Sequence, residues 1–125
     1  MKIGFIGLGI MGESMSWNIV KKHDDTVYVF DFVKEKTELL ASRGAVACSD
    51  SVELARNSDV IISMVPKSEH SRSVYMGILG ELDSTKTCID MSTIDQMCIR
   101  DRSWDFCWMT GWKPISLMRM WCPLP

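Results

Sequence analysis

Residues 2–12 read Lys2-Ile3-Gly4-Phe5-Ile6-Gly7-Leu8-Gly9-Ile10-Met11-Gly12, so a mostly apolar run leads into closely spaced glycines, and a helical pattern then continues to about Lys22. In this setting Gly7 permits a tight turn out of a strand, Gly9 lets a pyrophosphate approach the backbone, and Gly12 lets a helix pack closely on the strand. The helix directs its unpaired N–H groups and positive dipole end at the phosphates. The stretch therefore predicts a strand, a dinucleotide-binding turn and a helix.

An acidic residue supports the same interpretation. The β-rich run 26–30 is followed at once by Asp31, at about the twenty-residue distance expected of a carboxylate that binds the adenosine ribose. Asp31 favours NAD as the cofactor, because its charge repels a 2′-phosphate and the next two residues provide no guanidinium to receive one. NADP remains possible, since the ammonium groups of Lys34 and Lys36 can attract a phosphate.

Strand and helix patterns alternate as far as residue 95. They predict an α/β fold, a doubly wound parallel sheet of the Rossmann type with strand order 3-2-1-4-5 and right-handed crossovers. After the first two strands, the expected elements are helix 34–42 with a left-handed cap at Gly44, strand 45–48, a helix opened by a capping box of Asp50 and Glu53, strand 60–65, a helix capped by Ser68 that runs to about Gly77, and strand 87–91.

Spacing in the first helix predicts which of its faces is buried. Met11, Met15 and Ile19 recur every four residues and form a stripe to pack against the sheet. Trp17 falls off this stripe, so we expect it to be exposed on an isolated domain.

Composition excludes several classes of protein. The chain has 125 residues, enough for one domain with a core, and its formal charge of −2 provides no basic surface for nucleic acid or an anionic membrane. No stretch approaches the roughly twenty apolar residues that span a bilayer, and no signal segment is recognised, so we expect a cytoplasmic protein. Five cysteines without a Cys-x-x-Cys pair argue against a zinc site and a closed disulfide framework. Cys48 and Cys88 are interpreted as small apolar residues near strands, with a reactive thiol as the alternative.

The pattern fails after Asp95. Four of the five tryptophans lie in residues 96–125, and only Trp104, Trp108 and Trp112 keep a helical spacing that their neighbours do not continue. We therefore expect a nucleotide-binding domain over residues 1–95 and an irregular tail over residues 96–125.

Four segments carry a resemblance to a known family. Residues 4–12, then Met15 and Asn18, then 64–66 (Met-Val-Pro) and 89–94 (Ile-Asp-Met-Ser-Thr-Ile) resemble the N-terminal part of the β-hydroxyacid dehydrogenases, including 3-hydroxyisobutyrate dehydrogenase and 2-hydroxy-3-oxopropionate reductase. The resemblance extends to the NAD-binding domain of 6-phosphogluconate dehydrogenase. It implies an NAD(P)-dependent oxidoreductase that acts on a small hydroxy acid or semialdehyde, with a Rossmann domain followed by a helical domain. It also implies an intact enzyme that is a homo-oligomer.

The resemblance also implies a set of cofactor-binding residues, with no metal and no catalytic residue in this chain. The segment Gly7, Leu8, Gly9, Ile10, Met11 and Gly12 would hold the pyrophosphate, Asp31 the ribose, Val65 and Pro66 the cofactor at the switch point, and Thr93 the nicotinamide half. His70 falls where the family often has a polar residue near the cofactor, but a lone histidine on a helix face is more often a solvated side chain.

The chain departs from the family after Thr93. The family continues with a proline, a long helix, a glycine-rich substrate loop and a catalytic lysine, whereas here Gln96 stands at the proline's place and the later motifs are not found. Residues 97–102 look like out-of-frame sequence, with a divergent tail as the alternative. We therefore expect a truncated cofactor-binding part that is inactive and folds poorly. A non-catalytic dinucleotide-binding module and an interaction protein with a tryptophan-rich docking tail are the competing hypotheses.

Overall fold

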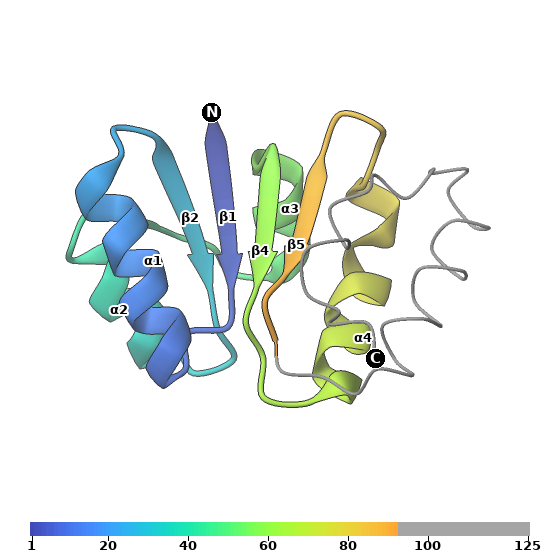
Figure 1. Ribbon diagram of the computed structural model, residues 1–125, viewed down its shortest axis with the longest axis horizontal. Coiled ribbons are helices and arrows are strands. Elements are labelled where there is room, and N and C mark those ends of the chain that lie inside the picture. The colour runs from blue at the N-terminus through green and yellow to red at the C-terminus, as the bar shows by residue number, and fades with distance from the viewer. Residues whose placement is uncertain (93–125) are drawn as a thin grey trace, which may run out of the picture. The chain divides into compact units, whose positions relative to one another are not determined.

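Five parallel strands form the centre of the structure, a computed structural model that describes residues 1–92 (Figure 1). Thr93 and the expected tail, 96–125, lie outside the described residues. The strand order is β3-β2-β1-β4-β5 and every neighbouring pair is parallel, so the predicted topology is confirmed. The strands are β1 (Lys2–Ile6), β2 (Thr26–Phe30), β3 (Val46–Ala47), β4 (Val60–Ser63) and β5 (Thr87–Asp90).

Helices connect the strands and cover both faces of the sheet (Figure 1). Their residues pack in two clusters, one with α1 and α2 and the other with α3 and α4. The elements are α1 (Ile10–Lys22), α2 (Lys34–Ala41), α3 (Ser51–Asn57), α4 (Ser68–Ile78) and a short 3₁₀ helix, η1 (Leu79–Glu81).

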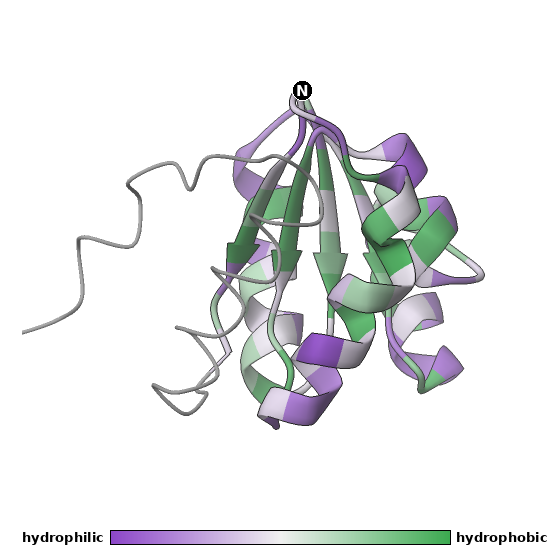
Figure 2. Cartoon of the chain, turned by 90° about the vertical axis from the view of Figure 1, so that its right-hand side faces the viewer, coloured by the Kyte–Doolittle hydropathy of each residue, from purple (hydrophilic) through white to green (hydrophobic). Residues whose placement is uncertain are grey.

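Alternation along the strands divides the core into these two clusters. On β1, Phe5 packs in the cluster of α1 and α2, whereas its neighbour Ile6 packs in the cluster of α3 and α4. Successive side chains of a strand point to opposite faces, so a strand covered on both faces must be apolar throughout. Figure 2 accordingly shows the strands mostly in the green of apolar residues, while the helices carry both green and purple.

The register brings the carboxyl ends of four strands to one edge of the sheet. Ile6 pairs with both Phe30 and Ser63, and Ser63 pairs with Asp90. The segments that follow β1, β2, β4 and β5 therefore leave the sheet side by side.

Several element boundaries differ from the sequence prediction, and α2 and β5 each end one residue earlier than expected. Strand β3 is shorter by a residue at each end, and β4 ends at Ser63 instead of Val65. The shorter β4 has a physical reason, because the Val65 N–H donates to the Ser92 side chain (2.9 Å) and not to a strand. Lys67, not Ser68, is the N-cap of α4.

Two predicted helix caps are present. Gly44 has φ +107°, and the Gly44 and Ala45 N–H groups donate to carbonyls at the end of α2, as in a left-handed cap. At the start of α3, the Glu53 N–H donates to Asp50 Oδ1 (2.7 Å). The Glu53 carboxylate completes the motif one residue earlier than expected, because it accepts from the N–H and O–H of Ser49 and not from the N–H of Asp50.

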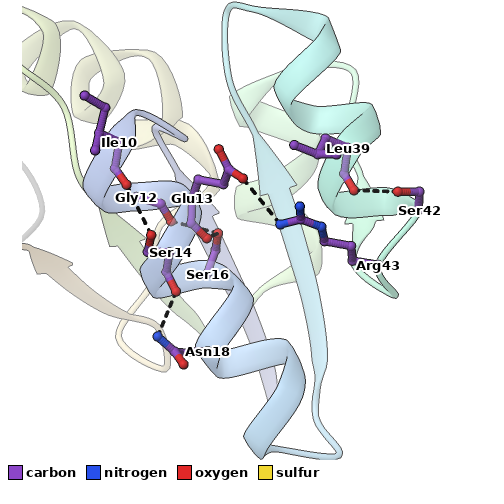
Figure 3. A network of polar contacts seen from close by, with 9 residues as sticks. All are labelled: Ile10, Gly12, Glu13, Ser14, Ser16, Asn18, Leu39, Ser42 and Arg43. Atoms are coloured by element: carbon purple, nitrogen blue, oxygen red, sulfur yellow. Dashed lines mark hydrogen bonds and ion pairs between the residues drawn. The ribbon is translucent and has the colours of Figure 1, made fainter.

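The buried face of α1 differs from the expected stripe. Gly12 and Ser16 are its buried residues, and Met15 and Ile19 of the expected stripe pack against the core as partly buried side chains. Met11 is 61% exposed, so only its assignment to the stripe is wrong. Trp17 is partly buried and packs against the core, and the guanidinium of Arg43 lies 5.4 Å from its ring centroid. Arg43 also pairs with Glu13 (Nη1 to Oε1, 3.3 Å), joining the end of α2 to α1 (Figure 3). The expectation of an exposed Trp17 is therefore wrong.

The thiols of Cys48 and Cys88 are free. Burial raises the pKa of each thiol to about 11, which makes both poor nucleophiles and supports their interpretation as small apolar residues. Within residues 1–92, no helix is long and apolar enough to cross a membrane, and no group of three metal-binding side chains is found.

Candidate cofactor-binding site

A cleft of about 660 Å³ lies at the carboxyl edge of the sheet. Its walls come from three segments, one after each of β1, β2 and β4. The lining residues are Ile6, Gly7, Gly9, Ile10, Met11 and Gly12 from the first, Phe30, Asp31, Phe32 and Lys36 from the second, and Met64, Val65, Pro66 and His70 from the third.

Two glycines fix the shape of the turn after β1. Gly7 has φ +93°, and a Cβ on it would lie 2.3 Å from the Met64 carbonyl oxygen. A Cβ on Gly12 would lie 1.9 Å from the Gly7 carbonyl oxygen, a distance at which no side chain fits. Gly7 thus makes the tight turn and Gly12 allows the close packing of α1, which are the roles their spacing predicts.

Gly9 is different from these two glycines. A Cβ built on it would meet no atom of residues 1–92 within 4 Å, so packing in the described part of the chain does not explain the glycine there. Gly9 is also the N-cap of α1 and makes no side-chain cap. The first N–H groups of a helix have no acceptor within the helix, and here no N-cap side chain accepts from them. Together with the positive end of the helix dipole, they point at the cleft that Gly9 to Gly12 line.

Asp31 joins the end of β2 to the glycine turn. Its Oδ2 accepts from the Leu8 N–H (2.6 Å) and its Oδ1 from the Val33 N–H (2.8 Å). Each carboxylate oxygen has a second lone pair, so both can still accept from a hydroxyl. The Leu8 side chain is fully buried in the core, so Leu8 serves the site through its backbone and does not line the cleft.

The β4 side of the cleft contains Val65, which is 7% exposed, and the exposed Pro66. His70 lines this side as an exposed side chain of the first turn of α4. On the opposite side Lys36 lines the cleft and Lys34 does not, which separates two lysines that the sequence could not rank.

Sequence reasoning missed four lining residues: Ile6, Phe30, Phe32 and Met64. Each is the last residue of a strand or lies within two residues of it, so the common edge of parallel strands was the signal that would have found them. Of the assigned residues, Thr93 lies outside the described residues, and all others except Leu8 line the cleft.

The residues present fit a dinucleotide. An open cradle above Gly9 and a free helix N-terminus suit a pyrophosphate, and a carboxylate with spare acceptors suits ribose hydroxyls. The cleft lies where the strand order reverses between β1 and β4, the usual place for a ligand in an open α/β sheet.

Comparisons with known proteins agree with this geometry. Residues 2–105 match the family model described as the NAD binding domain of 6-phosphogluconate dehydrogenase. The chain is 36% identical over 102 residues to a probable mitochondrial 3-hydroxyisobutyrate dehydrogenase of Dictyostelium discoideum, covering 79% of this chain and 32% of that protein. It is 34% identical over 96 residues to an NAD-dependent L-serine dehydrogenase of Pseudomonas aeruginosa, covering 74% and 32%.

Among solved structures, the 3-hydroxyisobutyrate dehydrogenase of Mycobacterium tuberculosis with L-serine matches with a TM-score of 0.75 and 29% identity, covering 86% of this chain and 35% of that one. The chain thus spans about a third of the length of these relatives.

Proposed function

Because the chain belongs to the family of the NAD-binding domain of 6-phosphogluconate dehydrogenase, we propose that its cleft binds NAD or NADP as the cofactor-binding part of an oxidoreductase. The observation that carries the proposal is Gly9, a glycine that no contact among the described residues requires and that lines the cleft. A pyrophosphate placed there accounts for the missing side chain.

The residues around the cleft then take distinct roles. Gly9 to Gly12 bind the pyrophosphate through N–H groups of the first turn of α1, and Asp31 accepts from the adenosine ribose. Val65 and Pro66 form the wall against the other half of the cofactor, and we assign Thr93, the residue after Ser92 in the sequence, to the nicotinamide half. When bound, the nicotinamide supplies or accepts a hydride.

The relatives support a substrate class. Their names concern 3-hydroxyisobutyrate and L-serine, which are both carboxylic acids with a hydroxyl on the third carbon. We propose a small 3-hydroxy acid, or the corresponding semialdehyde, as the substrate of the protein to which this cleft belongs.

We expect NAD to bind more tightly than NADP. The Asp31 carboxylate stays in place through two backbone N–H groups, and its negative charge opposes a 2′-phosphate. Lys36 offers an ammonium on the same side of the cleft and reduces the difference. Calorimetric titration of the chain with each nucleotide measures the two affinities, and tighter binding of NADP would contradict this assignment.

A valine at Gly9 tests the cleft itself. Gly9→Val places a side chain in the open space where we place the pyrophosphate, so we expect the loss of NAD binding with little change in unfolding temperature. Gly80→Val is the matched control, because a Cβ on Gly80 also meets no atom within 4 Å but Gly80 does not line this cleft. The proposal fails if the unmodified chain does not bind NAD, or if Gly9→Val binds it as well as Gly80→Val does.

A further inference from the structure

The end of β5 is tied to the β4 side of the cleft by hydrogen bonds that neither strand pairing nor the core requires. The Val65 N–H donates to Ser92 Oγ (2.9 Å), and the Ser92 N–H donates to Asp90 Oδ1 (3.0 Å). Asp90 Oδ2 in turn accepts from the hydroxyl of Ser71 in α4. The side chains of Asp90 and Ser92 thus join three elements, which are β5, α4 and the segment after β4.

This network begins at Val65, the residue after the last backbone hydrogen bond from this segment to β1. The Met64 N–H still donates to the Ile6 carbonyl of β1 (2.8 Å), and the next N–H, that of Val65, has Ser92 Oγ as its acceptor. Val65 is 7% exposed and lines the cleft. The Ser92 hydroxyl is therefore the contact that sets where this wall lies after the chain leaves the strand.

Helix α4 is held at the same edge by a second hydroxyl. Tyr75 lies one turn after Ser71, and its hydroxyl is 2.8 Å from Ser63 Oγ at the end of β4. Ser71 and Tyr75 therefore anchor one face of α4 to the ends of β5 and β4, so the Asp90 carboxylate that orients Ser92 is itself held in place.

We propose that Ser92 is a positioning residue, which through its hydroxyl holds Val65 at the distance from the glycine turn that the nicotinamide half of the cofactor needs. The inference rests on the proposed function of the cleft. Asp90 and Ser71 act through Ser92 by fixing its backbone. The adenosine half lies on the side of Asp31 and β2, beyond the reach of this network.

The link between Ser92 and Val65 can be tested without a ligand. In Ser92→Ala the Val65 N–H loses its acceptor, so we expect its hydrogen exchange, followed by NMR, to become about tenfold faster. The Met64 N–H is the internal control, because its acceptor on β1 is unchanged. Equal acceleration at both amides, or none at Val65, overturns the link whether or not the cleft binds NAD.

The consequence for binding is tested with two probes. We expect Ser92→Ala to bind NAD about five- to thirtyfold more weakly, and ADP, which lacks the nicotinamide half, within about twofold of the unmodified chain. Ser92→Thr keeps the hydroxyl and restores NAD binding. Ser58→Ala is the control, since it also removes a hydrogen-bonding serine hydroxyl, here a buried one that donates to the Leu54 carbonyl (2.7 Å) away from the cleft.

Each result decides for or against the positioning role. Equal weakening of NAD and ADP indicates a general loss of structure and overturns it, as does unchanged NAD binding in Ser92→Ala or a Ser92→Thr chain that stays weak. If Ser92→Ala does not fold, Ser71→Ala must give the same contrast between NAD and ADP, and its absence overturns the proposal. If the unsubstituted chain binds neither NAD nor ADP, it is the proposed function that is refuted.

Discussion

The carbonyl oxygen of Gly7 lies where a Cβ on Gly12 would project, 1.9 Å away. The Gly7 carbonyl and the Gly12 Cα that would carry the Cβ both belong to the backbone, which cannot move aside without separating α1 from β1. A single methyl group at this position therefore acts on the whole binding turn.

We expect Gly12→Ala to destabilise the protein by about 1–3 kcal/mol, the usual range for overpacking, even though alanine is the better helix former. The matched control is Gly77→Ala in α4, where a Cβ meets no atom of residues 1–92 within 4 Å, and which we expect to stabilise by about 0.5–1 kcal/mol. Urea denaturation followed by circular dichroism gives both values. Effects of the same sign would contradict the role of the contact.

Residue chemistry explains which site residues the sequence could predict. Gly7 and Gly12 have structural roles that only glycine can fill, so the pattern was sufficient to predict them. Asp31 lines the cleft, and its role toward the ribose stays a prediction. Leu8 and Met11 belong to the same stretch, but their side chains take opposite directions, one into the core and one into the cleft. Those directions depend on how α1 sits on the sheet, which the motif does not contain.

Helix α3 carries charged contacts at both of its ends. At its start, hydrogen bonds from the Ser49 O–H and N–H hold the pKa of the Glu53 carboxyl below its ordinary value of 4.5. Since the folded protein binds this proton less tightly than the unfolded chain, the stabilisation is present in full above about pH 4.5 and is lost as the pH falls through the lowered pKa.

We therefore expect Glu53→Gln to flatten the dependence of unfolding free energy on pH below 4.5. Ser49→Ala, which removes one of the donors, should flatten it in part. Denaturant titrations at a series of acidic pH values measure these slopes. A slope in Glu53→Gln as steep as in the unmodified chain would show that the capping carboxylate does not contribute.

At the other end of α3, the Lys86 ammonium donates to the carbonyls of Ala55 (2.6 Å), Ser58 (2.9 Å) and Arg56 (3.2 Å). A cation at a helix C-terminus is favourable, and here it donates to three carbonyls at that end, of which that of Ala55 also accepts from the Ser58 N–H (3.4 Å). We expect Lys86→Met to lower the free energy of unfolding by about 1–2 kcal/mol. Lys21→Met, at an exposed lysine in the last turn of α1, is the control and should cost less. Equal losses would argue that only the net charge matters.

The existence and order of the elements could be predicted from periodicity, because apolar strands and capped helices alternate clearly. Their ends and faces could not. Strand β4 stops early because Ser92, nearly thirty positions later, takes the Val65 N–H. The buried face of α1 centres on Gly12 and Ser16, since only there can the helix approach the sheet, and the methionine spacing does not reveal this.

For the whole molecule, we expect the 125-residue chain to bind nucleotide without catalysing its oxidation or reduction. The ionisable side chains that line the cleft in the described part are Asp31, Lys36 and His70, and Asp31 is engaged by backbone N–H groups. The glycine-rich substrate loop and catalytic lysine implied by the resemblance are not found in the sequence. Without substrate positioning and acid–base help, several orders of magnitude in rate are missing.

Absorbance of NADH, followed with L-serine, 3-hydroxyisobutyrate and short semialdehydes, measures this activity. A full-length relative such as the Dictyostelium discoideum dehydrogenase provides the positive control. The expectation is contradicted if this chain shows turnover and Gly9→Val abolishes it. The catalytic groups would then lie within these 125 residues.

The central position of β1 has a consequence for biosynthesis. One neighbour of β1, strand β2, follows it after a single helix. Its other neighbour is β4, and three helices and two strands are translated between β1 and β4. At roughly 5–20 residues per second, β1 waits several seconds on the ribosome with one edge open. The first strand to be made is therefore among the last to be completed, and the nascent chain depends on shielding of that edge until β4 emerges.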